Sequence, residues 1–160
     1  MQHDTPQPDF SERDFAFMQR ALALAMHARD VEGEVPVGAV LVLNDNVVGE
    51  GWNRNITLND PSAHAEIGAL RDGGQKLGNH RFPGSILYVT LEPCAMCAMA
   101  LVHARVARVV YGATDPKTGA AGSVFDTLTS ELHNHRVEVQ GGLLAEASAR
   151  LLRDFFRARR

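Results

Sequence analysis

Two short motifs contain the residue types that could bind a metal ion and activate a water molecule. His64 and Glu66, two residues apart, form the first, and Cys94 and Cys97, directly after Pro93, form the second. The chain has no other cysteine. Small secreted domains held by disulfides carry more cysteines, spread along the chain, so this close pair indicates a metal or redox site.

Both motifs are expected where a helix begins. Cysteines at i and i+3 lie on the same side of a helix, so the sulfurs of Cys94 and Cys97 can share one ion. The first turn of a helix also favours the thiolate form that binds metals, and Pro93 suits such a start because it has no N–H to leave unpaired. His64 and Glu66 would point to opposite sides of a helix flank, about 200° apart. We therefore expect two helix N-termini to face one metal, with the side chains converging beyond the helix ends.

The ligand set predicts zinc in a catalytic role. One imidazole, from His64, and two thiolates make three ligands, and three protein ligands plus a water are typical of catalytic zinc, whereas structural zinc has four. Zinc lowers the pKa of its water from about 15.7 toward about 7, and Glu66 could accept the proton that this water loses. Two alternatives stay open. A thioredoxin-like redox pair also opens a helix after a strand, and a structural zinc site would need a fourth ligand, for which the nearest candidate, His103, should face away from the pair.

The hydrophobic pattern predicts the elements that would carry these motifs. The expected helices are 11–33, 62–73, 94–102 and 144–157, and the expected strands are 37–43, 47–52, 86–91, 108–112 and 137–140. Ser11 is the expected N-cap of the first helix, and Gly73-Gly74 is the expected end of the second. The first helix should bury one face, formed by Phe15, Met18, Leu22 and Ala25. The last helix should bury the face formed by Leu144, Ala147, Leu151 and Phe155.

Strands that alternate with helices predict an α/β layered domain, and the opening hairpin, 37–52, makes its sheet mixed rather than purely parallel. Residues 1–10, with two prolines and few apolar groups, are expected to form a loose tail, and residues 11–160 a single domain. The chain has no apolar run long enough to cross a membrane, and its first residues are too polar for a signal peptide. We therefore expect a cytoplasmic protein without a membrane partner.

The charge of the chain limits how it could bind nucleic acid. A net charge of −3 argues against a protein that coats nucleic acid indiscriminately. Local binding remains open because basic residues gather at the C-terminus. These are Arg150, Arg153, Arg157, Arg159 and Arg160. The plainer interpretation is a solvated helix end, where cations are favourable.

From about Phe15 to its end, the sequence resembles the bacterial tRNA-specific adenosine deaminases of the cytidine deaminase-like superfamily. The order H-x-E…P-C-x-x-C is the zinc signature of that whole superfamily. Other stretches point to the tRNA branch. They are Glu34–Val40, Gly51–Arg54, Ala63–Glu66, Thr90–Cys94, Lys117–Ser123, Asn134–Val137 and Asp154–Arg157. The loop Thr129–Leu132 and the first residues depart from the family pattern.

The resemblance implies a three-layer α/β/α fold with a mixed five-stranded sheet, a homodimer, and zinc held by His64, Cys94 and Cys97. It implies that Glu66 carries protons to and from the substrate. The implied reaction is hydrolytic deamination of the wobble adenosine in a tRNA anticodon stem-loop, such as that of an arginine tRNA, to inosine. An anticodon loop already has unpaired bases, so extruding one costs less than from a duplex.

Substrate contacts are also implied by the resemblance. Asn53 would hydrogen-bond the flipped base, Val35 and Pro93 would line its pocket, Asp115 and Lys117 would contact the anticodon loop, and Phe156 would pack near the pocket. Plainer interpretations exist for three of them. Asn53 could be a turn residue, Asp115 could begin a turn, and Phe156 could belong to the core.

Two rival functions stay open. The nearer is a deaminase of a free base or nucleoside, such as guanine, cytosine or cytidine, with the same zinc chemistry. The other is a non-enzymatic RNA-binding module with a structural zinc. Glu66 counts against the second, because an acid beside the metal has no structural duty that glutamine could not fill.

Overall fold

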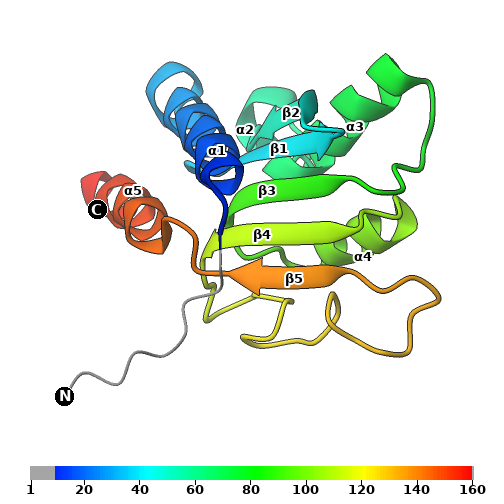
Figure 1. The fold of residues 1–160 in the computed structure, drawn as a ribbon. Helices are drawn as coiled ribbons and strands as arrows, with labels where there is room; N and C mark the ends of the chain where they lie inside the picture. The colour runs from blue at the N-terminus through cyan, green and yellow to red at the C-terminus, as the bar shows by residue number, and fades with distance from the viewer. Residues whose placement is uncertain (1–9, 160) are drawn as a thin grey trace.

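A five-stranded sheet forms the centre of the computed structural model, which describes residues 10–159 (Figure 1). The strand order across the sheet is β2-β1-β3-β4-β5. The strands are β1 (Gly38–Leu43), β2 (Asn46–Trp52), β3 (Ile86–Leu91), β4 (Arg108–Ala113) and β5 (Glu138–Gly141). β1 runs antiparallel to both β2 and β3, whereas β3, β4 and β5 run parallel. The expected mixed sheet of five strands is confirmed.

Helices cover both faces of this sheet. They are α1 (Glu12–Glu32), α2 (Asn55–Leu58), α3 (Ala65–Leu77), α4 (Ala95–His103) and α5 (Ala145–Ala158). Side chains of the strands alternate between two buried clusters, as the period of two in a strand requires. Val40, Tyr88 and Val110 pack with α1, whereas Leu41 and Leu87 pack with α3 and α4 on the other face. The three-layer arrangement predicted from the resemblance is therefore confirmed.

The first helix begins as predicted, and its buried face differs from the predicted one at Phe15. Ser11 is its N-cap and forms a capping box with Asp14, in which each side chain accepts the other's backbone N–H. Met18 and Ala25 are buried, as expected. Phe15 is exposed, contrary to the prediction, because the buried side of α1 near its start is taken by Asp14.

The predicted end of the second helix at Gly73-Gly74 is wrong, because α3 continues to Leu77 and ends at Gly78, in the left-handed conformation. Gly73 lies where α3 approaches the sheet closely. A Cβ atom there would come within 2.7 Å of Leu41 Cδ2. The glycine therefore permits contact between helix and sheet rather than terminating the helix.

Other differences are small. The short helix α2 was not predicted, and the inward side of α5 carries Ser148 together with Phe155, while Ala147 is exposed. Residues 1–9 of the expected tail lie outside the described residues, and Phe10 packs partly against the cluster under α1. Among residues 10–159, no helix is long and apolar enough to span a membrane.

Candidate metal centre and active site

Two helix N-termini meet at one point, as the motifs predicted. His64 is the N-cap of α3, and Cys94 is the N-cap of α4, which begins shortly after the end of β3. Cys97 lies one turn further along α4 and is buried. The β-sheet brings the two helices together because α3 packs on β1 and β2 while α4 follows β3, the neighbour of β1.

The three side chains have the spacing that a zinc ion requires. His64 Nδ1 lies 3.5 Å from the sulfur of Cys94 and 3.5 Å from that of Cys97, and all three candidate ligand atoms lie within 4.8 Å of one another. Tetrahedral zinc with bonds of about 2.0–2.3 Å separates nitrogen and sulfur ligands by about 3.5 Å. His103 is exposed at the far end of α4. The residues present therefore fit a three-ligand ion with a position left for water.

The pKa values of the two thiols shift in opposite directions. Hydrogen bonds with Cys97 and with His64 outweigh the effect of burial and lower the pKa of the Cys94 thiol from 9.0 to about 4. The same bond with Cys94, together with burial, raises the pKa of Cys97. Cys94 is therefore a thiolate at neutral pH, and an arriving zinc ion would displace the proton of Cys97.

Glu66 lies beside this cluster and away from solvent. It stands in the first turn of α3 and is 4% exposed. Burial raises its pKa from 4.5 to about 7. It lies two residues after the candidate ligand His64, and its carboxyl group contributes to the raised pKa of Cys97. A carboxyl group at this position can exchange a proton with a water on the ion.

Asn53 connects the end of β2 to the start of α3. Its side-chain oxygen accepts the backbone N–H of Ala65 at 3.0 Å. Ala65 is the residue between His64 and Glu66, so this bond holds the backbone that carries both motif side chains. The contact of Asn53 with a base stays a prediction.

The two expected pocket residues are both at least partly buried. Val35 is half-buried and packs against the hydrophobic cluster that includes Ala65 and Ala98, on the helices that carry the motifs. Pro93 is buried, and its carbonyl accepts the N–H of Ala120 at 2.8 Å. Pro93 directly precedes the candidate ligand Cys94, and the contact of either residue with a base stays a prediction.

The remaining predicted contacts lie on loops and on α5. The Asp115 carboxylate accepts the N–H groups of Lys117 and Thr118, as the plainer turn interpretation expected, and Lys117 is exposed. Phe156 is 51% exposed, so the interpretation of it as a core residue is wrong. Its ring meets that of Phe155 edge to face at 5.3 Å.

The burial of two acidic residues was not predicted from the sequence. Glu34 is 1% exposed and accepts the N–H groups of Ile56 and Thr57, which holds α2. Glu92 is 2% exposed and accepts hydrogen bonds from the loop after β4. One feature of the sequence could have revealed their burial: each acid lies beside a short apolar strand and has no charged partner nearby in the sequence.

Comparison with known proteins agrees with this site. Residues 11–113 match the family described as the cytidine and deoxycytidylate deaminase zinc-binding region. The tRNA-specific adenosine deaminase of Haemophilus influenzae is 52% identical over 94% of this chain and 87% of its own length. That of Bacillus subtilis is 43% identical over 91% of this chain and 89% of its own length.

Solved structures give the same relationship. A structure from work on A-to-I editing by tRNA:A34 deaminases at the wobble position superposes with a TM-score of 0.82 at 46% identity, covering 86% of this chain and 99% of that one. A guanine deaminase from Nitrosomonas europaea superposes with a TM-score of 0.75 at 27% identity, covering 88% and 83%. The zinc-binding region confirms zinc as the expected cofactor. With the zinc signature, the three-layer fold and these identities together, the chain belongs to the family of tRNA-specific adenosine deaminases.

Proposed function

We propose that this protein converts the wobble adenosine of a tRNA anticodon to inosine by zinc-dependent hydrolysis. One observation carries the proposal. The candidate ligands His64, Cys94 and Cys97 converge with the buried Glu66 at two helix N-termini, in a chain that is 52% identical to a tRNA-specific adenosine deaminase.

The chain's own residues account for the proton movements. His64, Cys94 and Cys97 would hold the zinc ion, which would act as a Lewis acid and lower the pKa of water at the site. Glu66 accepts a proton from the attacking water and returns it to the ring nitrogen beside C6. Glu66 then carries the second proton of that water, from the new C6 hydroxyl group, to the exocyclic amino group. The C6–N bond breaks, ammonia leaves, and the oxygen stays on C6 as the carbonyl of inosine. Such general acid–base help contributes about 10²–10⁴ in rate.

Asn53 orients the base in this proposal. An N–H group can only donate, so the bond from Ala65 fixes the side-chain oxygen of Asn53 toward α3. The amide nitrogen of Asn53 is then directed elsewhere and can donate to an acceptor on the base. Val35 and Pro93 provide the apolar walls against which the base packs.

The loop after β4 and the helix α5 are proposed to contact the RNA that lies outside the base pocket. β3, β4 and β5 run parallel, and α5 follows β5, so α5 and the loop after β4 lie at the same end of the sheet (Figure 1). The Cys94 turn follows β3 at this end as well. This arrangement supports RNA contacts by Asp115 and Lys117, and a place for the exposed Phe156 near the substrate.

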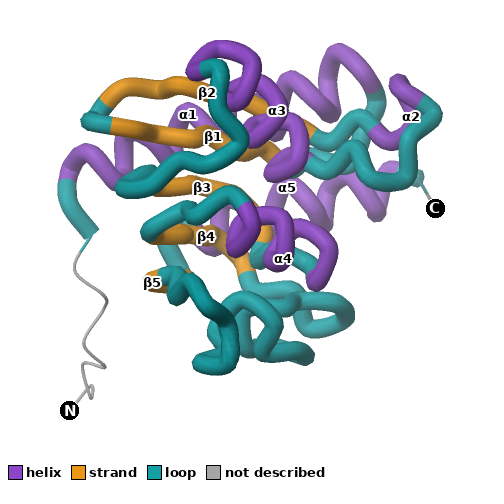
Figure 2. The backbone as a smooth tube through the Cα atoms, turned by 90° about the vertical axis from the view of Figure 1, so that its right-hand side faces the viewer, coloured by secondary structure: helices purple, strands orange, loops and turns teal. Residues whose placement is uncertain are grey.

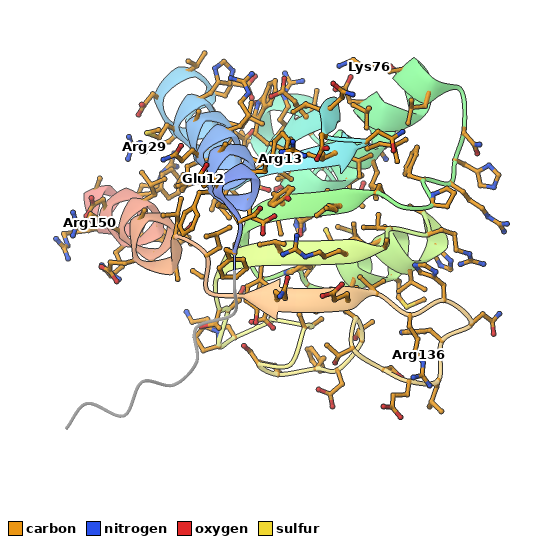
Figure 3. The ribbon with its side chains drawn as sticks, viewed as in Figure 1. Glu12, Arg13, Arg29, Lys76, Arg136 and Arg150 are labelled. Carbon is orange, nitrogen blue, oxygen red and sulfur yellow. The ribbon has the colours of Figure 1, made fainter. Side chains whose placement is uncertain are left out.

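Arginines on α5 are proposed to bind RNA phosphates, which favour basic side chains without reading sequence. The structure narrows the candidates. Arg159 donates to the carbonyl of Gly33 and stacks 4.2 Å from the ring of Phe155, so it holds α5 to α1. Arg150, labelled in Figure 3, and Arg157 are exposed and carry the proposal. Arg160 lies outside the described residues.

The double variant Arg150→Gln with Arg157→Gln should weaken binding of an anticodon stem-loop and reduce the slope of log affinity against log salt by about one to two. Fluorescence anisotropy across a salt series measures both. The pair Arg13→Gln with Lys76→Gln removes the same net charge from α1 and α3 and is the control (Figure 3). Equal effects of the two double variants would contradict a specific role for α5.

Three further parts of the proposal come from the family resemblance. The protein is proposed to be a cytoplasmic homodimer that edits an arginine tRNA. Light scattering after gel filtration measures the mass in solution, and a mass of one chain would contradict the dimer. Comparison of arginine tRNA with other tRNAs that carry a wobble adenosine tests the choice of substrate.

The reaction itself is tested by nucleoside mass spectrometry after the zinc-loaded protein is incubated with an arginine tRNA bearing a wobble adenosine. Inosine should form at that position. Glu66→Gln should fold, hold zinc and lose turnover, because glutamine cannot accept the proton. If Glu66→Gln retained activity, the assignment of the proton carrier would be wrong. Absence of inosine together with turnover of free guanine or cytosine would favour the small-substrate rival, to which the guanine deaminase structure is a precedent at 27% identity.

A further inference from the structure

One buried carboxylate joins residues 92–94, called the Cys94 turn, to the loop after β4. Glu92 lies between the end of β3 and Cys94, and only 2% of it is exposed. Its carboxylate accepts the N–H groups of Asp115 at 3.0 Å, Ala121 at 2.9 Å and Ser123 at 3.1 Å. The hydroxyl of Ser123 donates to it as well. Four donors from residues 115–123, called here the 115–123 loop, therefore converge on a single side chain.

The backbone around Glu92 reinforces this attachment. The N–H of Glu92 donates to the carbonyl of Ala113 at 2.8 Å, and the carbonyl of Pro93 accepts the N–H of Ala120 at 2.8 Å. Gly119 passes so close that a Cβ atom there would come within 2.5 Å of the Glu92 carboxylate. The loop is thus packed tightly against the carboxylate, and only a glycine fits at position 119.

The loop has no regular structure of its own to hold it. It belongs to the long connection between β4 and β5, which Figure 2 shows as loop beside α4 and β5. The Glu92 carboxylate, by accepting four hydrogen bonds, holds the backbone of this loop in place as the hydrogen bonds of a helix or strand would. A buried acceptor of this kind is costly to replace, because each donor left unpaired loses its hydrogen bond without regaining water.

We propose that Glu92 is a positioning residue whose carboxylate fixes the 115–123 loop against the Cys94 turn and thereby sets the affinity for the RNA around the target base. The inference rests on the proposed function, because the loop carries Asp115 and Lys117, the residues assigned to the anticodon loop. The carboxylate of Glu92 bonds to the 115–123 loop and to no side chain of the candidate metal ligands. Its loss should therefore weaken RNA binding while the chemical step at the zinc site persists.

The first test is independent of catalysis. Lys117 is exposed within the loop and offers trypsin a cleavage site. In zinc-loaded Glu92→Gln, one N–H donor must face the new amide NH2 group, so the loop should open more often and cleavage after Lys117 should be about tenfold faster. Glu12→Gln, an exposed acid at the start of α1, is the control and should cleave as the wild type does (Figure 3). Mass spectrometry identifies the cleaved bond, and an unchanged rate in Glu92→Gln would overturn the inference.

The second test separates affinity from chemistry. With an anticodon stem-loop as substrate, Glu92→Gln should raise KM about tenfold and change kcat less than about twofold, with zinc content unchanged. A fall in kcat at constant KM, or a loss of zinc, would instead assign Glu92 to the metal site and overturn the inference.

Ser123→Ala keeps the test available if Glu92→Gln does not fold. It removes a single donor to Glu92 and should raise KM about threefold with kcat unchanged. In the double variant the effect of Ser123→Ala should shrink, since the two residues act through one contact; full additivity would overturn the inference. Inosine formation by the wild type in the same assay tests the proposed function separately, and the trypsin result stands whether or not inosine forms.

Discussion

Asp14 connects α1 to the middle of the sheet through an ion pair with the half-buried Arg108. It is 4% exposed and accepts hydrogen bonds from Tyr88 at 2.6 Å and from both terminal nitrogens of Arg108 at 2.9 and 3.1 Å. Burial by itself raises the pKa of Asp14, but the hydrogen bonds from Arg108, Tyr88 and the Ser11 backbone outweigh it and lower the pKa from 3.8 to about 2. The ionised carboxylate is therefore strongly preferred in the folded protein.

This pKa shift has a direct consequence for stability. The difference between 3.8 and about 2 corresponds to about 2.5 kcal/mol in favour of the folded state. Because the folded-state pKa lies below the unfolded value, this stabilisation is complete above about pH 5 and declines as the pH falls toward 2. About 1 kcal/mol of it should be lost by pH 3.

Asp14→Asn keeps the shape of the side chain and removes its charge. At pH 7 it should lower the free energy of unfolding by about 3 kcal/mol, because the half-buried guanidinium of Arg108 loses its charged partner. The difference from the wild type should narrow by about 1 kcal/mol between pH 7 and pH 3. Urea unfolding followed by circular dichroism, at a fixed protein concentration, measures both quantities. Zinc release at low pH affects both proteins and cancels in the difference.

Asp45→Asn is the matched control, since Asp45 pairs with Arg13 at 2.5 Å on the surface, where their side chains are 64% and 70% exposed. Exposed ion pairs contribute little, so its unfolding midpoint should equal that of the wild type. Two results would refute the reasoning: an Asp14→Asn protein as stable as the control, or a stability difference that stays constant from pH 7 to pH 3.

Two further predictions concern the metal and the packing of α3. Cys97→Ser replaces a thiolate with a hydroxyl that stays protonated at neutral pH, so the purified variant should hold far less zinc than the wild type's ~one ion per chain by plasma mass spectrometry; equal zinc contents would contradict the ligand assignment. Gly51→Ala would bring a Cβ atom within 2.2 Å of the carbonyl of Ala65. The displaced start of α3, which carries His64, should lower both the thermal midpoint and zinc affinity, with a stability loss of about 3 kcal/mol. A thermal midpoint equal to that of the wild type would contradict this prediction, because it would mean that α3 moves away from the added methyl group at little cost.

Much of the fold followed from local patterns in the chain. The strands and the long helices were predicted within a few residues because burial on both faces requires continuous apolar runs, and because Ser11 is a strong N-cap. The predicted end at Gly73 failed because a glycine can permit close packing as well as end a helix. Only the neighbouring strand distinguishes the two uses, and that strand is remote in the sequence.

Residue type and order predicted the zinc chemistry of the site, with a redox pair and a structural zinc as the alternatives. His64, Glu66, Cys94 and Cys97 specify a three-ligand zinc site with an acid beside it, since thiolate and imidazole are zinc ligands in any fold. Their convergence depended on the sheet, which sets α3 beside α4 and places the first turns of both at one point. The role of Glu92 was decided only by the tertiary structure. Its hydrogen-bond donors lie more than 20 residues away in the chain, so no local pattern could assign them. Short-range spacing determines which groups can react, whereas the burial of a charge and its long-range partners exist only after the chain has folded.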